Sequence, residues 1–168
     1  RLASEKHVDW ICKAVIQARS EVPELSLDIY GEGGERSKLE TIIRENNASS
    51  YIRLMGQHDL SEVYQNYEAY IAGSTSEGFG LTLMEAVGGG LPIIGFDVRY
   101  GNPTFIRDGE NGYLISLPEE DKDRVEALRK GIVDLFKQDL EHFHSVSYEV
   151  AGDFLTSNVQ EKWREAVC

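Results

Sequence analysis

The chain has 168 residues, of which 41% are hydrophobic and 27% charged, and its formal net charge is −12 at pH 7. This size and composition are typical of one globular domain with a single core. The acidic balance argues against duplex nucleic acid and anionic membrane surfaces as partners, because both need clustered Lys and Arg; a small phosphate-bearing ligand needs only a few local donors.

Helical and strand-like segments alternate along the chain. In the first segment apolar residues recur at helical spacing (Val8, Ile11, Val15), and Pro23 ends it. Helices are predicted at residues 5–20, 39–47, 60–67, 81–87, 102–106, 121–137 and 147–167. Strands are predicted at residues 25–30, 51–55, 69–72, 92–96 and 113–115.

This alternation predicts right-handed βαβ units in an α/β, Rossmann-like doubly wound fold with one parallel sheet of about six strands. Ligands of such sheets bind beyond the carboxyl ends of the strands. The segments that follow those ends are rich in glycine or polar residues: 31–34, 56–59, 74–80 and 97–102. We therefore expect the functional site there.

The most informative segment runs from Ser76 to Ala86. It carries Glu77 on a loop and Glu85 in the helix that follows, while Gly78 allows the backbone to approach a ligand. The amides of residues 80–82 begin this helix without internal acceptors, an arrangement that attracts phosphate. The simpler alternative is that Glu77 caps the helix and Glu85 faces water.

This pattern resembles the signature of the retaining GT-B glycosyltransferases of family 4. The two glutamates have seven residues between them, the first lies in Ser-Glu-Gly-Phe-Gly-Leu, and Gly-Gly-Gly-Leu-Pro follows the second. Residues 1–6, 27–33 and 108–114 match further segments of that family in type and order. The resemblance covers nearly the whole chain. It implies that residues 1–168 are the C-terminal, donor nucleotide-sugar-binding domain, with the N-terminal acceptor domain missing from this chain.

Residues 95–106 and a Glu-Lys-Trp near the end are similar to the A subunits of accessory-Sec glycosyltransferases. Those enzymes add N-acetylglucosamine to Ser and Thr of serine-rich-repeat adhesins. The resemblance implies UDP-GlcNAc as donor, a Ser/Thr-rich acceptor protein, a partner B subunit and no cofactor. It also implies a cytoplasmic location, with peripheral attachment to the inner face of the membrane only through missing parts. Wall teichoic acid α-glycosyltransferases share much of the pattern and are the alternative, and no residue here decides GlcNAc over glucose.

The resemblance implies three catalytic residues. Arg1 and Lys6 would neutralise the diphosphate and the charge that grows on it as UDP leaves, and Glu77 would contact the hydroxyls of the donor sugar. Glu85 would accept hydrogen bonds from the ribose. The other implied donor-binding residues are Phe79 and Gly80, whose backbone would shape the sugar pocket, and Leu81 and Thr82, whose amides would hold a phosphate. Gln57 and His58 would lie near the uracil.

No metal or NAD site is expected. Asp121 and Asp123 form an Asp-x-Asp, but it opens a helix rather than ending a hydrophobic strand. Fixed cations and amide dipoles can stabilise a leaving diphosphate without metal. Segment 31–34 departs from the dinucleotide fingerprint, because Arg36 stands where the third glycine belongs; it is either a plain turn or part of the nucleotide site. His142 and His144 are predicted to be surface residues.

The sequence also supports expectations about the cysteines, the closing helix and the competing functions. Cys12 and Cys168 have no metal or redox spacing, so we expect free thiols, with Cys12 on a buried helix face. The apolar positions Val159, Trp163 and Val167 predict a closing helix that packs either on the missing domain or on its own sheet. The competing functions are a non-catalytic nucleotide-sugar-binding or chaperone subunit and an unrelated doubly wound domain; the Glu77/Glu85 pair with Lys6 favours the enzyme.

Overall fold

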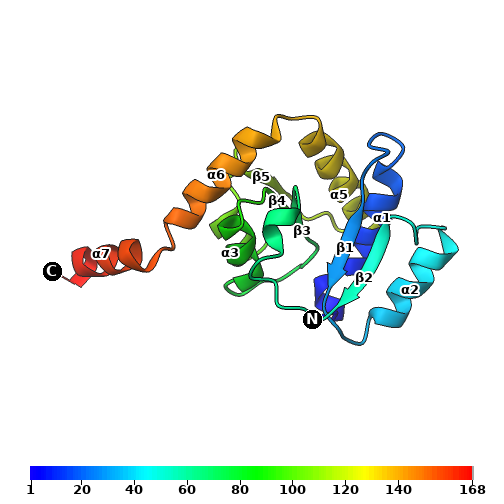
Figure 1. The fold of residues 1–168 in the computed structure, drawn as a ribbon, viewed down its shortest axis with the longest axis horizontal. Helices are drawn as coiled ribbons and strands as arrows, with labels where there is room; N and C mark the ends of the chain where they lie inside the picture. Colours follow the sequence, from blue (N-terminus) through cyan, green and yellow to red (C-terminus); the bar gives the residue numbers. More distant parts are fainter. Residues whose placement is uncertain (168) are drawn as a thin grey trace.

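The computed structural model describes residues 1–167, and it is an alternation of short strands and helices (Figure 1). The strands are β1 (Leu27–Tyr30), β2 (Ile52–Gly56), β3 (Tyr70–Ala72), β4 (Ile93–Phe96) and β5 (Gly112–Ile115). The α-helices are α1 (Val8–Ala18), α2 (Arg36–Glu45), α3 (Leu81–Gly88), α4 (Gly101–Phe105), α5 (Asp121–Phe136), α6 (Leu140–Gly152) and α7 (Thr156–Val167). Two 3₁₀ turns are η1 (Ser4–Lys6) and η2 (Tyr64–Asn66). Among these helices, none is both long and apolar enough to cross a membrane.

The strands form two parallel sheets, not the single sheet of about six strands predicted from the sequence. β1 pairs with β2, and β4 lies between β3 and β5. Within the described residues no hydrogen bonds join β1 to β3, so each of these strands keeps one unpaired edge. Sequence periodicity reports which segments are extended, but it does not report which strands are neighbours. The expected parallel direction is confirmed in every pair.

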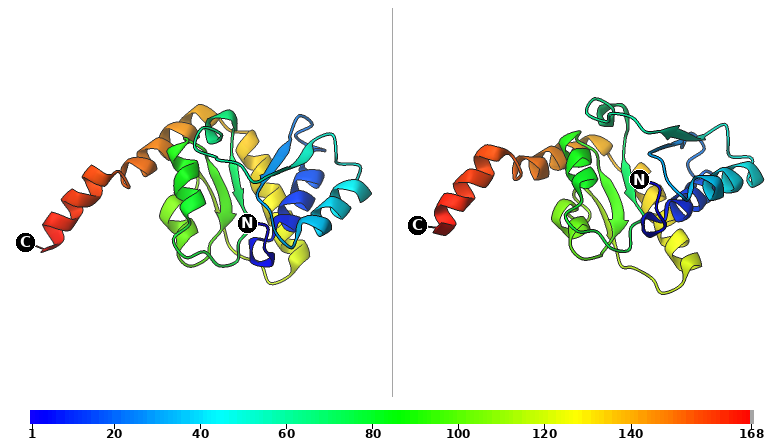
Figure 2. Two further views of the ribbon diagram at one scale, coloured as in Figure 1. Left: turned by 60° about the horizontal axis from the view of Figure 1, so that its bottom comes forward. Right: turned by 90° about the horizontal axis from the view of Figure 1, so that it is seen from below.

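One core nevertheless runs beneath both sheets. β4 is buried along its whole length because apolar side chains and a glycine meet packing on both faces. Helix α1 packs against both α2 and α5, and the same buried cluster contains Ile29 from β1 and Phe96 from β4. Figure 2 shows the start of the chain between the two sheets. The α1–α5 layer therefore holds the sheets together without strand pairing.

Several predicted helices have different limits in the structure. The segment 5–20 breaks at His7, whose φ of 43° is left-handed, so that η1 precedes α1. The segment 60–67 is helical only in η2, and 147–167 divides into α6 and α7. The predicted burial of Cys12 is confirmed, and burial raises the pKa of its thiol to about 12.

Helix α7 extends away from the body of the domain in every view (Figures 1 and 2). Its Trp163 is 68% exposed and Val159 is half-buried. This arrangement does not match the alternative in which the closing helix packs on its own sheet. The side chain of Val167 and all of Cys168 lie outside the described residues, so the predicted third apolar position and the second free thiol stay predictions.

Candidate functional site

The loops that follow β3 and β4 are joined through the backbone of Glu77. Its N–H donates to the Arg99 carbonyl (3.2 Å), and its carbonyl accepts from the N–H of Tyr100 (2.7 Å) and Gly101 (3.2 Å). A Cβ at Gly101 would lie only 2.8 Å from Cγ of Glu77, so glycine allows this approach. The carboxyl ends of β3 and β4 thus form one surface, as the sequence predicted for the ligand edge.

Lys6 reaches Glu77 across this surface. The two side chains form an ion pair with Nζ and Oε2 2.5 Å apart, and the Glu77 side chain is only 17% exposed. Lys6 is held by its neighbour His7, whose ring stacks on Trp10 at 3.6 Å and whose Nε2 lies 3.3 Å from Oγ1 of Thr75. The pairing confirms that residues near the start of the chain meet the Glu77 loop.

The N-terminus of α3 is open toward the same surface. Gly80 precedes the helix with a φ of 84°, a left-handed conformation that glycine adopts without strain. Its carbonyl accepts from Leu83 and Met84, while no side chain caps the helix. The first amides, those of Leu81 and Thr82, have no acceptor within the helix. They can therefore donate to an anion, and the helix dipole favours negative charge there.

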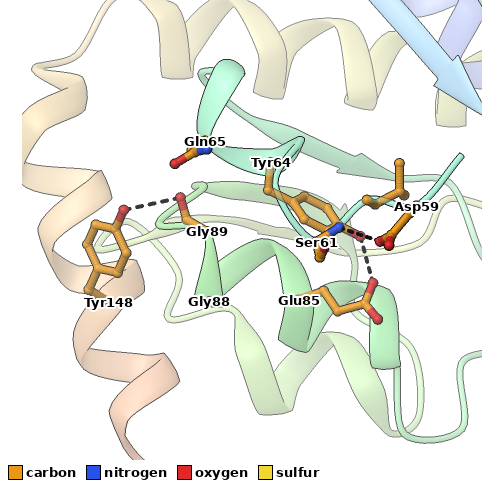
Figure 3. A pocket seen from close by; sticks show the side chains of 9 residues that line it. Asp59, Ser61, Tyr64, Gln65, Glu85, Gly88, Gly89 and Tyr148 are labelled. Atoms are coloured by element: carbon orange, nitrogen blue, oxygen red, sulfur yellow. Dashed lines mark hydrogen bonds between the residues drawn. The ribbon is translucent and has the colours of Figure 1, made fainter.

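Glu85 lies one turn further along α3 and accepts a hydrogen bond from the hydroxyl of Tyr64 (2.8 Å). Both side chains line a hollow of about 470 Å³ (Figure 3). The other lining residues come from the loop after β2, the end of α3 and helix α6: Asp59, Leu60, Ser61, Gln65, Gly88, Gly89 and Tyr148. The hollow is mostly polar, which suits a ligand rich in hydroxyl groups.

Phe79 is anchored on an aromatic cluster beside the Glu77 loop. Its ring is 52% exposed and meets Phe105 edge-on at 5.5 Å and Phe154 at 6.4 Å. The contact with Phe105 joins the loop that carries Glu77 and Phe79 to α4. The role in the sugar pocket that the resemblance implies for the Phe79 backbone stays a prediction.

The remaining predicted residues do not converge on Glu77. Arg1 pairs with Glu5 (2.9 Å), and its side chain is 75% exposed. Gln57 is exposed, and His58 is held in its own loop by the Met55 carbonyl at 2.9 Å. His58 also meets the Tyr30 ring edge-on at 5.8 Å. These two residues do follow β2 directly, so they share the ligand edge of the fold.

Two tyrosines beside α3 were missed by the sequence analysis. Tyr64 bonds Glu85, and the hydroxyl of Tyr70 donates to Oγ1 of Thr82 (3.1 Å). Burial, with the nearby charges of Glu77 and Glu85, raises the pKa of Tyr70. Tyr70 falls in an apolar run and Tyr64 in a mostly polar segment, and neither context indicates a role for the hydroxyl. Their hydroxyl partners could be found only once η2 and β3 were placed beside α3.

The Asp-x-Asp segment forms the first turn of α5. Asp121 pairs with Arg124 at 2.7 Å. Across the described part of the chain, no group of three or more His, Cys, Asp or Glu side chains is placed to hold a metal ion. His142 is exposed as predicted, but the surface prediction for His144 is wrong: His144 is half-buried, with Nδ1 2.7 Å from the Gly90 carbonyl. The cause is the packing of α6 on the glycine-rich end of α3.

The segment 31–34 packs on the first residues of the chain. Leu2 donates to the Glu32 carbonyl (2.9 Å), and a Cβ at Gly33 would lie 2.2 Å from the Leu2 carbonyl oxygen. Glycine is required there for that close approach. The geometry therefore favours a structural turn over a nucleotide-lining role for Gly33.

The site combines a cation and open helix amides with two carboxylates. Lys6 and the start of α3 suit a phosphate-bearing ligand, whereas Glu77 and Glu85 suit hydroxyl donors. A ligand with both kinds of group, such as a nucleotide joined to a sugar, satisfies the whole set.

Comparisons with known proteins agree with this chemistry. The family of glycosyl transferases group 1 matches residues 1–147. The "UDP-N-acetylglucosamine--peptide N-acetylglucosaminyltransferase GtfA subunit" of Limosilactobacillus reuteri subsp. suis is 56% identical over 99% of this chain and 33% of the relative. The chain thus spans about a third of the length of this relative.

Two solved structures have the same fold. The pneumococcal O-GlcNAc transferase GtfA, in complex with UDP and GlcNAc, is 52% identical with a TM-score of 0.93 over 99% of this chain and 34% of that one. A chain of a GtfA/B complex is 53% identical with a TM-score of 0.90, again over 99% and 34%. The predicted class is confirmed: parallel sheets flanked by helices, as in the C-terminal domains of GT-B glycosyltransferases.

Proposed function

The chain belongs to the glycosyl transferases group 1 family, and from this premise we propose that it is the donor-binding part of a longer UDP-GlcNAc-dependent enzyme. That enzyme transfers N-acetylglucosamine to Ser and Thr side chains of serine-rich-repeat adhesins. The proposal is supported by 56% identity, across nearly the whole chain, to a GtfA subunit that is about three times as long.

The observation that carries the proposal is the Lys6–Glu77 ion pair beside the open start of α3. In the proposed complex the amides of Leu81 and Thr82 hold the diphosphate and Lys6 neutralises it. Glu77, which Lys6 orients, binds hydroxyls of the donor sugar. Glu85 accepts hydrogen bonds from the ribose. Negative charge grows on UDP as it leaves, and these fixed donors stabilise it.

We propose that the enzyme is a retaining, metal-independent member of family 4. Arg1 is the second proposed cation at the diphosphate, a role that requires its side chain to leave Glu5. Phe79 and Gly80 shape the sugar pocket, and Gln57 and His58 are proposed for the uracil because they follow β2 at the ligand edge.

We further propose a B subunit as partner and the cytoplasm as location. The partner is supported by the likeness to a chain of a GtfA/B complex at 53% identity. The location is the one that the resemblance to accessory-Sec glycosyltransferases implies. Contact with the inner face of the membrane is assigned to parts outside this chain.

Transfer assays with the full-length protein test this function. We expect transfer from UDP-GlcNAc to a Ser/Thr-rich repeat peptide, at a rate that a metal chelator leaves unchanged. UDP-glucose serves as the competing donor and a polyol-phosphate polymer as the competing acceptor. If the enzyme prefers the polymer, the proposed acceptor is a wall teichoic acid and not an adhesin. Activity only with Mn²⁺ or Mg²⁺ would contradict the metal-independent mechanism, and UDP-GlcNAc binding without any transfer would favour a non-catalytic subunit.

A further inference from the structure

Glu85 is an exposed carboxylate without a cationic partner among the described residues. Among the ion pairs that the structure describes, none involves Glu85, whereas Glu77 on the same surface is paired with Lys6. The polar contact that Glu85 does make is the hydrogen bond from Tyr64 to Oε2, at 2.8 Å. A carboxylate in this setting keeps its second oxygen available for a ligand, and one neutral donor decides which way that oxygen faces.

Tyr64 is itself held firmly. It lies in η2, its side chain is 8% exposed, and it belongs to the buried cluster that contains Ala86 and Val87 of α3. A Cβ at Gly89 would lie 2.5 Å from Cβ of Tyr64, so the end of α3 packs directly on this residue. The ring therefore cannot swing without disturbing the helix, and its hydroxyl stays at Glu85 (Figure 3).

The phenol is also suited to act as a permanent donor. Burial and the adjacent Glu85 carboxylate raise the pKa of Tyr64, so the hydroxyl keeps its proton at neutral and mildly alkaline pH. A hydrogen bond to a charged acceptor is also stronger than one between neutral groups.

We propose that Tyr64 is a positioning residue for the donor nucleotide: it fixes the Glu85 carboxylate so that the free oxygen meets the ribose hydroxyls. The inference rests on the ribose-binding role proposed above for Glu85. Tyr64 comes from the loop between β2 and β3, so it couples that loop to the affinity of α3 for the nucleotide.

The test is calorimetric titration of UDP into the full-length protein. Tyr64→Phe keeps the ring and removes only the hydroxyl, and we expect UDP affinity to fall by about three- to tenfold. Tyr51→Phe is the matched control, because Tyr51 stands before the start of β2, packs under Arg19 and does not line the hollow. The control should bind UDP like the unaltered protein.

Two further measurements separate positioning from packing. In a Glu85→Ala background, Tyr64→Phe should cause no additional loss, and the loss should also vanish for a UDP analogue that lacks both ribose hydroxyls. An equal loss in that background or with the analogue would assign Tyr64 to packing and overturn the inference. No loss for Tyr64→Phe while Glu85→Ala weakens binding would overturn the inference alone. UDP binding unchanged by Glu85→Ala would instead remove the proposed ribose role, and this inference with it.

Discussion

Glu77 and Glu85 stand eight positions apart and have opposite electrostatic settings. Glu77 is paired with Lys6, and Glu85 is bonded to a neutral phenol. A carboxylate held by a cation is oriented and partly neutralised, while one held by a phenol keeps its full charge for hydroxyl donors. This difference supports the division of roles between sugar and ribose.

Alanine substitutions should separate these roles. We expect Glu85→Ala to weaken UDP binding by about 1–3 kcal/mol, the range for losing a hydrogen bond to a charged group. Glu77→Ala should leave UDP affinity nearly unchanged and lower the turnover of UDP-GlcNAc. Calorimetry and transfer rates on the full-length protein measure both. Equal losses of UDP affinity would contradict the division.

At the scale of elements, the loops after β3 and β4 act as one unit because Glu77 pairs with residues 99–101. We expect Gly101→Ala to push the Glu77 loop outward, since the new Cβ would lie 2.8 Å from Cγ of Glu77 and 3.0 Å from the Phe79 carbonyl oxygen. Transfer should fall more than UDP affinity. Gly152→Ala is the control, because nothing lies within 4 Å of its Cβ position. Normal transfer by Gly101→Ala would show that the loop tolerates displacement.

The β1–β2 pair contains the carboxylate of Asp28, whose pKa differs between the folded and the unfolded chain. Burial alone would raise the pKa of Asp28, but hydrogen bonds from Arg53 and Tyr67 outweigh burial and hold the pKa below its usual range. A depressed folded-state pKa stabilises the fold above the unfolded pKa, about 3.9. That stabilisation is lost as the pH falls through the folded-state value.

Arg53→Leu should therefore lower the melting temperature at pH 7, and the difference from the unaltered protein should shrink below about pH 3. Arg44→Leu is the control, since Arg44 contacts Thr41 rather than a carboxylate in the described structure. Thermal unfolding followed by circular dichroism across pH measures the effect. If the difference in melting temperature stays constant with pH, the effect of Arg53→Leu does not come from Asp28.

The sequence predicted most elements because apolar spacing and glycine positions are local properties. The α3 segment with Gly80 at its start is a clear case, and the ligand edge followed from it. The break at His7 was not predictable, because its left-handed backbone is stabilised by a stack on Trp10 and a contact with Thr75. The role of Tyr64 was hidden for the same reason: its partner lies 21 positions away and on another element.

At the scale of the whole molecule, the proposed function assigns acceptor binding to a part of the longer enzyme outside this chain. We expect the 168-residue chain alone to transfer no sugar, while the full-length protein does, because the acceptor must be positioned by another part. Positioning can account for about 7–11 kcal/mol of barrier lowering. Transfer assays at equal concentration of fragment and full-length protein measure this. Comparable turnover would mean that the acceptor site lies within these residues.

Helix α7 is exposed, which is relevant to the difference between the 168-residue chain and the full-length protein. It carries the 68% exposed Trp163 away from both sheets. Leu155, in the turn before it, is 59% exposed. Apolar side chains on an extended helix are typical of a surface that packs against something else. This placement agrees with the expectation that the closing helix serves another domain.

The unpaired edges of β1 and β3 also affect whether the chain self-associates in solution. Each edge offers free N–H and C=O groups, the template on which strands of neighbouring molecules add to a sheet. Dividing five strands between two sheets leaves four such edges among the described strands instead of two. We therefore expect the 168-residue chain to associate through strand addition in concentrated solution.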